Sequence, residues 1–115
     1  MKKTYYLSTC STCTRFIKEL NLDDSFSFQD IKAEKITPDQ IDVMKKLSGS
    51  YESLFSKRAM KYKALGLKDK TLSETDIRRL ILDEYTFLKR PVIIIDDKIF
   101  IGNAKKTIEN VANFL

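Results

Sequence analysis

The sequence predicts a single α/β domain, and three segments carry that prediction. Residues 1–22 are typical of a strand, a short loop and a helix; residues 37–85 carry helix signals; residues 90–115 are typical of two strands and a helix. The length of 115 residues suits one domain, residues 1–115. Because 43% of the residues are hydrophobic and 32% carry charge of both signs, the composition is that of a globular chain.

The first third of the chain predicts a strand, a helix and a second strand. Residues 4–7 favour strand, and residues 8–14 are rich in the Ser and Thr that cap helices. Apolar residues then recur at helical spacing, at Cys13, Phe16, Ile17 and Leu20. Phe26 and Phe28 alternate with polar neighbours as far as Ile31, which predicts the second strand.

The middle of the chain predicts helices. Thr37 and Gln40 form a capping box that starts a helix, which ends at Gly49. Residues 51–65 are predicted to form a basic helix that stops at Gly66. Ser73 with Asp76 opens a further helix. The apolar stripe of this helix is Ile77, Leu80, Ile81 and Tyr85.

The last quarter predicts a hairpin and a helix. Residues 92–95 form a continuous β-branched run, typical of a strand covered on both faces. Residues 96–98 predict a tight turn and residues 99–101 a partner strand. After Gly102, the stripe of the final helix is Ile108, Val111, Ala112 and Leu115.

The order of these elements predicts a small mixed four-stranded sheet flanked by helices, with a helical insertion at about residues 37–85. Periodicity alone leaves other α/β arrangements open. The position of the cysteines, directly after the first strand, favours the thioredoxin-like plan.

Composition excludes several kinds of chemistry. The chain has no His, which removes Cys-His catalysis and most zinc sites, so we expect no metal and no bound cofactor. No apolar run approaches the roughly 20 residues that span a bilayer, so no membrane partner is expected. The net charge of +5 lies in residues 57–70, which can attract anions, but no nucleic-acid-binding motif is present. Two cysteines do not make a disulfide scaffold, and we expect a cytoplasmic protein.

The motif Cys10-Ser11-Thr12-Cys13 indicates thiol redox chemistry. A helix that begins near Ser11 directs its unpaired N–H groups and dipole at Cys10, which favours the thiolate, the nucleophilic form. Cys10 is therefore the predicted exposed nucleophile. Cys13, inside the first turn, is predicted to be more buried and able to close a disulfide. Two alternatives stay open: two inert core residues, or half of a metal site.

The same helix end is suited to an oxyanion. Its N–H groups would come from the stretch that holds Ser11 and Thr12. Arg58 and Arg90 are candidates to complete the site, because a guanidinium forks onto a tetrahedral oxyanion. Pro91 would start the central strand, where the loss of its N–H is tolerated; on general grounds its peptide bond would be trans.

Three blocks in this order resemble the arsenate reductase/Spx family: residues 6–13, residues 54–58 and residues 89–94. The resemblance covers nearly the whole chain and implies a thioredoxin fold with a helical insertion. It implies that Cys10 is the nucleophile, that Arg58 and Arg90 bind the substrate, and that Pro91 follows a cis peptide bond. The implied activity is a thiol-dependent oxidoreductase that acts on an oxyanion such as arsenate or on a mixed disulfide. Glutathione, glutaredoxin or thioredoxin would be the electron donor and redox partner.

The chain also departs from arsenate-reducing members. Thr14 stands where they carry an Arg four residues after the nucleophile, and Asn103 replaces the Arg after the late glycine. Lys105 or Lys106 could supply charge there, but not a fork. Cys13 resembles the second cysteine of Spx regulators. A redox-sensing transcriptional regulator that binds the RNA polymerase alpha subunit, with Gly49 at the contact surface, is therefore the alternative function.

Overall fold

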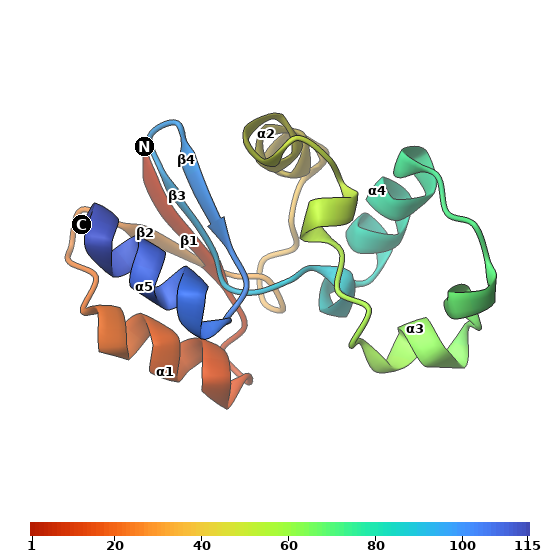
Figure 1. The fold of residues 1–115 in the computed structure, drawn as a ribbon, viewed down its shortest axis with the longest axis horizontal. Coiled ribbons are helices and arrows are strands. Elements are labelled where there is room, and N and C mark those ends of the chain that lie inside the picture. Colours follow the sequence, from red (N-terminus) through yellow and green to blue (C-terminus); the bar gives the residue numbers. More distant parts are fainter. The chain divides into compact units, whose positions relative to one another are not determined.

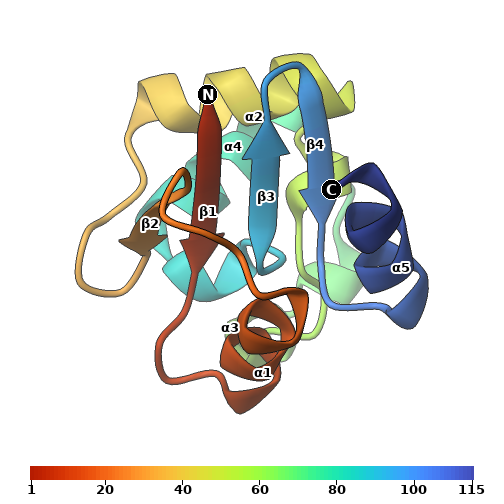
Figure 2. The ribbon, with the colours of Figure 1, turned by 90° about the vertical axis from the view of Figure 1, so that its left-hand side faces the viewer.

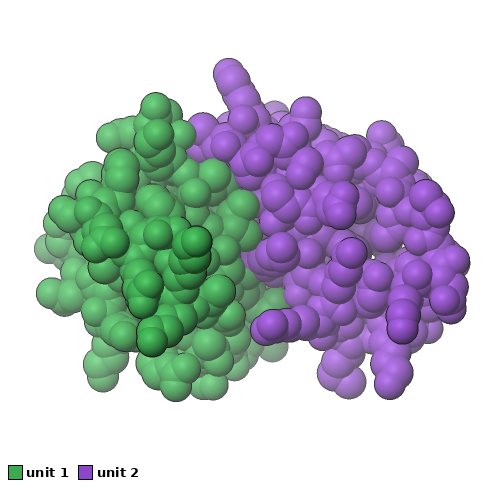
Figure 3. Space-filling view, viewed as in Figure 1, with its two compact units in different colours: residues 1–34, 90–115 green, residues 35–89 purple.

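The computed structural model describes residues 1–115 and divides into two compact units. Unit 1 comprises residues 1–34 and 90–115, and unit 2 comprises residues 35–89 (Figure 3). The insertion therefore extends beyond residues 37–85 at both ends. None of the helices has the length and apolar character that crossing a membrane requires.

Unit 1 is built on a four-stranded mixed sheet in the order β2-β1-β3-β4 (Figures 1 and 2). The strands are β1 (Lys2–Tyr6), β2 (Ser27–Asp30), β3 (Val92–Ile95) and β4 (Lys98–Ile101). β1 pairs parallel with β2 and antiparallel with β3, and β3 pairs antiparallel with β4. The helix α1 (Ser11–Leu20) connects β1 to β2, and α5 (Lys105–Phe114) follows β4. Because β1 and β2 are parallel, their carboxyl ends lie at the same edge of the sheet.

The two helices of unit 1 pack on one face of the sheet and enclose its core (Figure 2). This core consists of the buried side chains of Phe16, Phe26, Ile93, Ile95 and Val111. All four side chains of β3 are buried, as the β-branched run predicts. Phe16 of α1 thus packs in one cluster with Ile93 and Ile95 of β3.

Three predicted core residues of unit 1 are exposed instead. Phe28 is 44% exposed because β2 is an edge strand, and its ring packs edge-on against Tyr6, with 6.2 Å between ring centroids. Ala112 and Leu115 are exposed, whereas Val111 carries the contact of α5 with the core. Phe114, rather than Leu115, packs on the sheet: its ring lies against Phe100 of β4, with ring centroids 5.7 Å apart.

Unit 2 consists of helices. They are α2 (Pro38–Ser48), the 3₁₀ turn η1 (Glu52–Leu54), α3 (Met60–Ala64), the 3₁₀ turn η2 (Leu67–Asp69), α4 (Glu74–Asp83) and the 3₁₀ turn η3 (Tyr85–Phe87). Both predicted capping boxes are confirmed: the Gln40 N–H donates to the Thr37 hydroxyl and the Asp76 N–H to the Ser73 hydroxyl, each at 3.1 Å. Gly49 ends α2 with a φ of 98°, in the left-handed region that favours glycine.

The prediction of one helix over residues 51–65 is wrong. The chain is extended at Phe55, which forms an antiparallel bridge with Leu88. The Ser56 N–H donates to the Phe87 carbonyl oxygen at 2.6 Å, and the Lys89 N–H donates to the Leu54 carbonyl oxygen at 2.8 Å. This pairing buries Phe55 against the Phe87 ring, 5.2 Å between centroids, so a contact distant in sequence overrides local helix propensity. Tyr85, expected in the stripe of α4, lies in η3.

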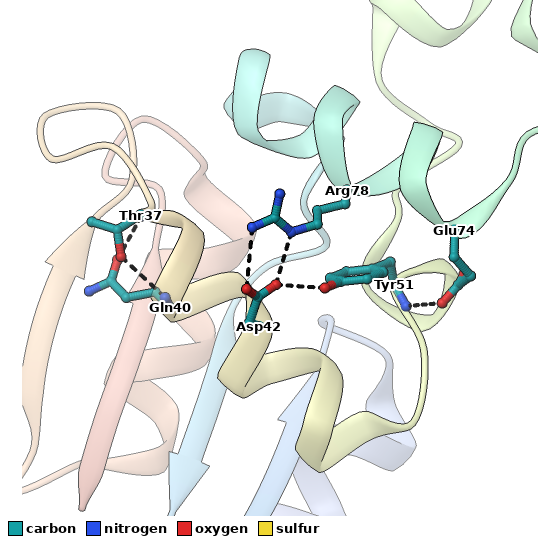
Figure 4. Close-up of polar contacts among 6 residues, drawn as sticks. All are labelled: Thr37, Gln40, Asp42, Tyr51, Glu74 and Arg78. Atoms are coloured by element: carbon teal, nitrogen blue, oxygen red, sulfur yellow. Dashed lines mark hydrogen bonds and ion pairs between the residues drawn. The ribbon is translucent and has the colours of Figure 1, made fainter.

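A polar network holds the segment after α2 in place (Figure 4). Asp42 accepts two hydrogen bonds from the Arg78 guanidinium, at 2.9 and 3.2 Å, and one from the Tyr51 hydroxyl at 2.6 Å. Glu74 accepts the backbone N–H groups of Tyr51 and Glu52 at 2.7 and 3.1 Å. The hydrogen bonds from Arg78 and Tyr51 lower the pKa of Asp42. These contacts join α2, η1 and α4 within unit 2.

Candidate thiol site

Cys10 is the N-cap residue of α1. Its N–H donates to the Leu7 carbonyl oxygen at 3.0 Å, which closes a tight turn after β1, and its carbonyl oxygen accepts the Thr14 N–H at 3.1 Å. Its backbone is extended, with φ −93° and ψ 108°, and no side chain caps this end of the helix. The thiol is half-buried. The first-turn N–H groups of α1, at Ser11 and Thr12, therefore have no side-chain partner from the cap residue.

Cys13 lies one turn further into α1, and its side chain is fully buried. Burial raises the pKa of the Cys13 thiol, and a backbone hydrogen bond with Leu7 partly opposes that rise. The charge of Cys10 raises the same pKa further, whereas the charge of Arg90 lowers it. As predicted from their positions on the helix, the first cysteine is the accessible one and the second is enclosed.

Asp30, at the carboxyl end of β2, forms hydrogen bonds with the loop that precedes Cys10. The Ser8 hydroxyl donates to one carboxylate oxygen at 2.6 Å, and the Ser8 N–H lies 3.4 Å from the other. The Ser8 hydroxyl is the main reason that the pKa of Asp30 is lowered. The negative charge of Asp30 in turn raises the pKa of Cys13. Asp30 thus acts on the preceding loop through hydrogen bonds with Ser8 and on Cys13 through its charge.

Arg90 and Pro91 begin the segment that leads into β3. The peptide bond between them is cis, as the resemblance implies. Pro91 is buried, and its carbonyl oxygen accepts the Gly102 N–H at 2.9 Å. This hydrogen bond places Gly102 and the following Asn103 beside the start of β3. Within unit 1, Cys10 and Arg90 both lie near enough to Cys13 for their charges to act on it, and Pro91 adjoins Arg90 in the chain.

Thr14 occupies the position where arsenate-reducing members carry an Arg. Its hydroxyl donates to the carbonyl oxygens of Ser11, at 3.1 Å, and of Cys10, at 3.3 Å. This side chain is thus engaged with the backbone of its own helix turn. Lys105 and Lys106 are exposed in the first turn of α5, whose N-cap Ala104 offers no side-chain hydrogen bond.

Arg58 lies in unit 2, exposed in the segment between η1 and α3. No group of three or more Cys, Asp and Glu side chains is arranged to hold a metal ion.

Asp30 and Ser8 are functional candidates that sequence reasoning missed. The signal that could have identified them was the predicted parallel pair. Since the ends of parallel strands meet at one edge of a sheet, the residue that ends the second strand lies beside the loop that follows the first. An Asp at that place and a Ser in that loop are a natural hydrogen-bonded pair.

Solved structures similar to this chain include three bacterial proteins. A possible arsenate reductase from Streptococcus mutans is 28% identical, with a TM-score of 0.73, and the match covers 96% of this chain and 97% of that one. A protein from Staphylococcus aureus is 27% identical with the same TM-score and coverage. An arsenate reductase from Vibrio cholerae, at 17% identity, has a TM-score of 0.75 over 99% of this chain and 97% of its own. The predicted thioredoxin-like fold is confirmed.

A search of curated protein sequences finds no match. The model of the ArsC family, in contrast, matches residues 5–111, nearly the whole chain, in agreement with the resemblance carried by the three sequence blocks. Because this match covers most of its length, the chain belongs to the ArsC family.

Proposed function

We propose that this chain is a thiol-dependent oxidoreductase of the arsenate reductase type, with Cys10 as its nucleophile. The proposal rests on the different environments of Cys10 and Cys13 at the start of α1. Cys10 is accessible at a helix end that no side chain caps, and Cys13 is enclosed one turn away. The uncapped N–H groups and the helix dipole place partial positive charge at this helix end, which attracts an anionic substrate.

The substrate is an oxyanion or a mixed disulfide. With arsenate, the Cys10 thiolate forms a sulfur–arsenic bond, and an arsenate hydroxyl takes up a proton from solvent and leaves as water. A second thiol then loses its proton to solvent, and its sulfur attacks the Cys10 sulfur. The new disulfide forms as the sulfur–arsenic bond breaks, and its electron pair stays on arsenic, which passes from As(V) to As(III). With a mixed disulfide, Cys10 attacks one sulfur and releases the other as a thiolate.

The second thiol comes from Cys13 or from glutathione. Because the pKa of Cys13 is raised by burial, this group is a neutral thiol at rest and does not compete with Cys10 for the substrate. Thioredoxin or glutaredoxin then reduces the resulting disulfide. We propose no bound cofactor, since the electrons pass through sulfur at every step.

The N–H groups of Ser11 and Thr12 together with Arg90 are the proposed oxyanion contacts. Arg90 already acts on Cys13 through its charge. The role of Arg58 rests on the resemblance alone. Asn103 at the third arginine position provides no guanidinium fork, which favours a mixed disulfide over arsenate as the better substrate.

The test is a pair of cysteine variants assayed with each substrate and each electron donor. Cys10→Ser is expected to abolish turnover. Cys13→Ser is expected to accumulate a covalent adduct on Cys10, visible by intact-protein mass spectrometry, if Cys13 resolves it. If Cys13→Ser retains full turnover with glutathione present and loses it without, glutathione is the resolving thiol. Full reductase activity in Cys10→Ser contradicts the mechanism.

The regulator alternative is favoured by one observation in unit 2. Gly49 is exposed, and a Cβ added there would have no atom within 4 Å, so the backbone at this point is open to a partner. A pull-down with the RNA polymerase alpha-subunit tail separates this alternative from the enzyme. Retention that depends on Gly49 and on the oxidation state of the cysteines would favour the regulator.

A further inference from the structure

Unit 2 contains a hollow that the proposed thiol chemistry does not use. Its volume is about 140 Å³, and its lining includes Phe55 and Tyr62, whose rings meet edge-on with centroids 5.9 Å apart. The rest of its apolar wall is aliphatic, formed by Leu67, Leu72 and Ile77. The elements around it, η1, α3, η2 and the start of α4, can be followed in Figure 1.

The size of the hollow limits what can enter it. Sites for drug-sized ligands usually measure about 300–1,000 Å³. A hollow of about 140 Å³ is smaller than such sites and is suited to one apolar side chain. Five of its eight lining residues are aromatic or aliphatic, so a nonpolar part of an inserted side chain has apolar groups to pack on.

The rim of the hollow is charged. Lys57 and Lys70 line it, together with one carboxylate, that of Glu52. The basic segment, residues 57–70, connects the two lysines and carries six basic side chains against one acidic side chain. Lys61 is neutralised by Glu84, with 2.8 Å between the charged atoms, which leaves an exposed excess of positive charge.

Two exposed apolar side chains extend the surface beyond the hollow. Met60 is 89% exposed and Leu65 is 50% exposed, and both belong to the basic segment. A small molecule that fills the hollow would reach neither these side chains nor all of the lysines. A hollow lined by both apolar and basic residues, with further exposed apolar side chains and cations along the same segment, fits an extended chain of opposite charge.

We propose that the basic segment and its hollow bind an acidic segment of a partner protein, which inserts one aromatic or aliphatic side chain. Carboxylates on either side of that side chain pair with Lys57 and Lys70, and the inserted group packs on Tyr62 and Leu72. This interaction is independent of Cys10 and goes beyond the proposed redox function.

The experiment measures the fluorescence anisotropy of three labelled peptides with the intact chain. The first is rich in Asp and Glu around a single Phe, the second has Ala in place of that Phe, and the third has Lys in place of the acidic residues. The first is expected to bind at least about tenfold more tightly than either of the others. Equal binding of the Phe and Ala peptides would reduce the interaction to general charge attraction and overturn the proposal.

Protein variants locate the binding. Lys57→Glu/Lys70→Glu is expected to weaken binding of the Phe peptide about tenfold or more. The matched control Lys35→Glu/Lys46→Glu makes the same change of charge at exposed positions of unit 2 outside the basic segment, and is expected to weaken it less than about twofold. Similar losses in both variants contradict the proposed location.

Filling or enlarging the hollow tests the inserted side chain. Leu72→Phe and Tyr62→Ala are each expected to remove the preference for the Phe peptide while binding of the Ala peptide stays the same. Melting curves identify a variant that fails to fold, and the other then decides. A single-stranded RNA of equal negative charge that competes fully with the Phe peptide, or a preference unchanged in a folded variant, would overturn the proposal.

Discussion

The starts of the long helices differ between the two units. In unit 2, α2 and α4 are each closed by a complete capping box, as Figure 4 shows for Thr37 and Gln40. In unit 1, α1 begins at Cys10 and α5 at Ala104, and neither has a side-chain cap. The comparison teaches that unit 2 uses helix-end N–H groups for stability, whereas unit 1 leaves them available. It also implies that α1 is held by packing on the sheet.

The most destructive way to test the comparison is to remove that packing. Phe16 of α1 is 1% exposed in the core of unit 1, so Phe16→Ala is expected to lower the free energy of unfolding by about 3–5 kcal/mol. Urea unfolding measures the loss. The control is Ile17→Ala, a half-buried neighbour on the same helix, for which a loss below about 2 kcal/mol is expected. Equal losses would mean that packing at Phe16 is not what holds α1.

Removing the caps of unit 2 has the next largest effect. Thr37→Ala and Ser73→Ala each delete the hydroxyl that accepts a backbone N–H, and each is expected to cost about 1 kcal/mol. Thr75→Ala serves as control, because Thr75 is exposed inside α4 and Ala is the better helix former. Urea unfolding of all three variants provides the comparison. A cap variant as stable as the control would remove the distinction between the units.

Adding an N-cap residue to α1 tests the same difference between the units in the opposite direction. Cys10→Ser places a preferred N-cap residue at the start of α1 and is expected to raise the free energy of unfolding by about 0.5–1 kcal/mol. The same variant is expected to lose turnover, so stability and activity would move in opposite directions. Cys10→Ala is the control, with little change expected because Cys10 makes no capping hydrogen bond. A less stable Cys10→Ser protein would contradict an open helix end.

The sequence predicts these helix ends well because capping is local. Each capping box marks the start of its helix within four residues, independently of the rest of the chain: Thr37 with Gln40, and Ser73 with Asp76. Residues 51–65 could not be predicted in the same way, because the bridge between Phe55 and Leu88 joins segments far apart in sequence.

The same division applies to the candidate site. The motif predicts that Cys13 is more buried than Cys10, because Cys10 precedes the helix and Cys13 lies in its first turn. The hydrogen bond between Ser8 and Asp30 depends instead on the parallel pairing of β1 with β2, which sequence patterns indicate only in outline.

A smaller effect concerns the alkaline side of the pH range. Because burial raises the pKa of Cys13 above that of a free thiol, about 8.5, the unfolded chain loses this proton first as the pH rises. The contribution of Cys13 to stability is full below about pH 8.5 and is lost as the pH rises through its pKa in the folded chain. Unfolding measured from neutral to moderately alkaline pH is expected to show this loss, and Cys13→Ala to reduce it. An unchanged slope in Cys13→Ala would exclude Cys13 as its source.

The smallest predicted effect distinguishes the two capping boxes of unit 2. Hydrogen bonds with Ser73 lower the pKa of Asp76, whereas Gln40, its counterpart in α2, does not titrate. The stabilisation from Asp76 is therefore present above the unfolded pKa of about 3.9 and is lost as the pH falls through its pKa in the folded chain. NMR titration of the Asp76 carboxyl measures that pKa. A titration of Asp76 that Ser73→Ala leaves unchanged would show that the Ser73 hydroxyl does not contribute and that the backbone N–H of residue 73 accounts for the shift.

The unequal accessibility of Cys10 and Cys13 has a practical consequence. A maleimide spin label added in equal molar amount is expected to attach at the open sulfur and spare the enclosed one, without any engineered residue. Such a probe would report directly on motion at the N-terminal end of α1.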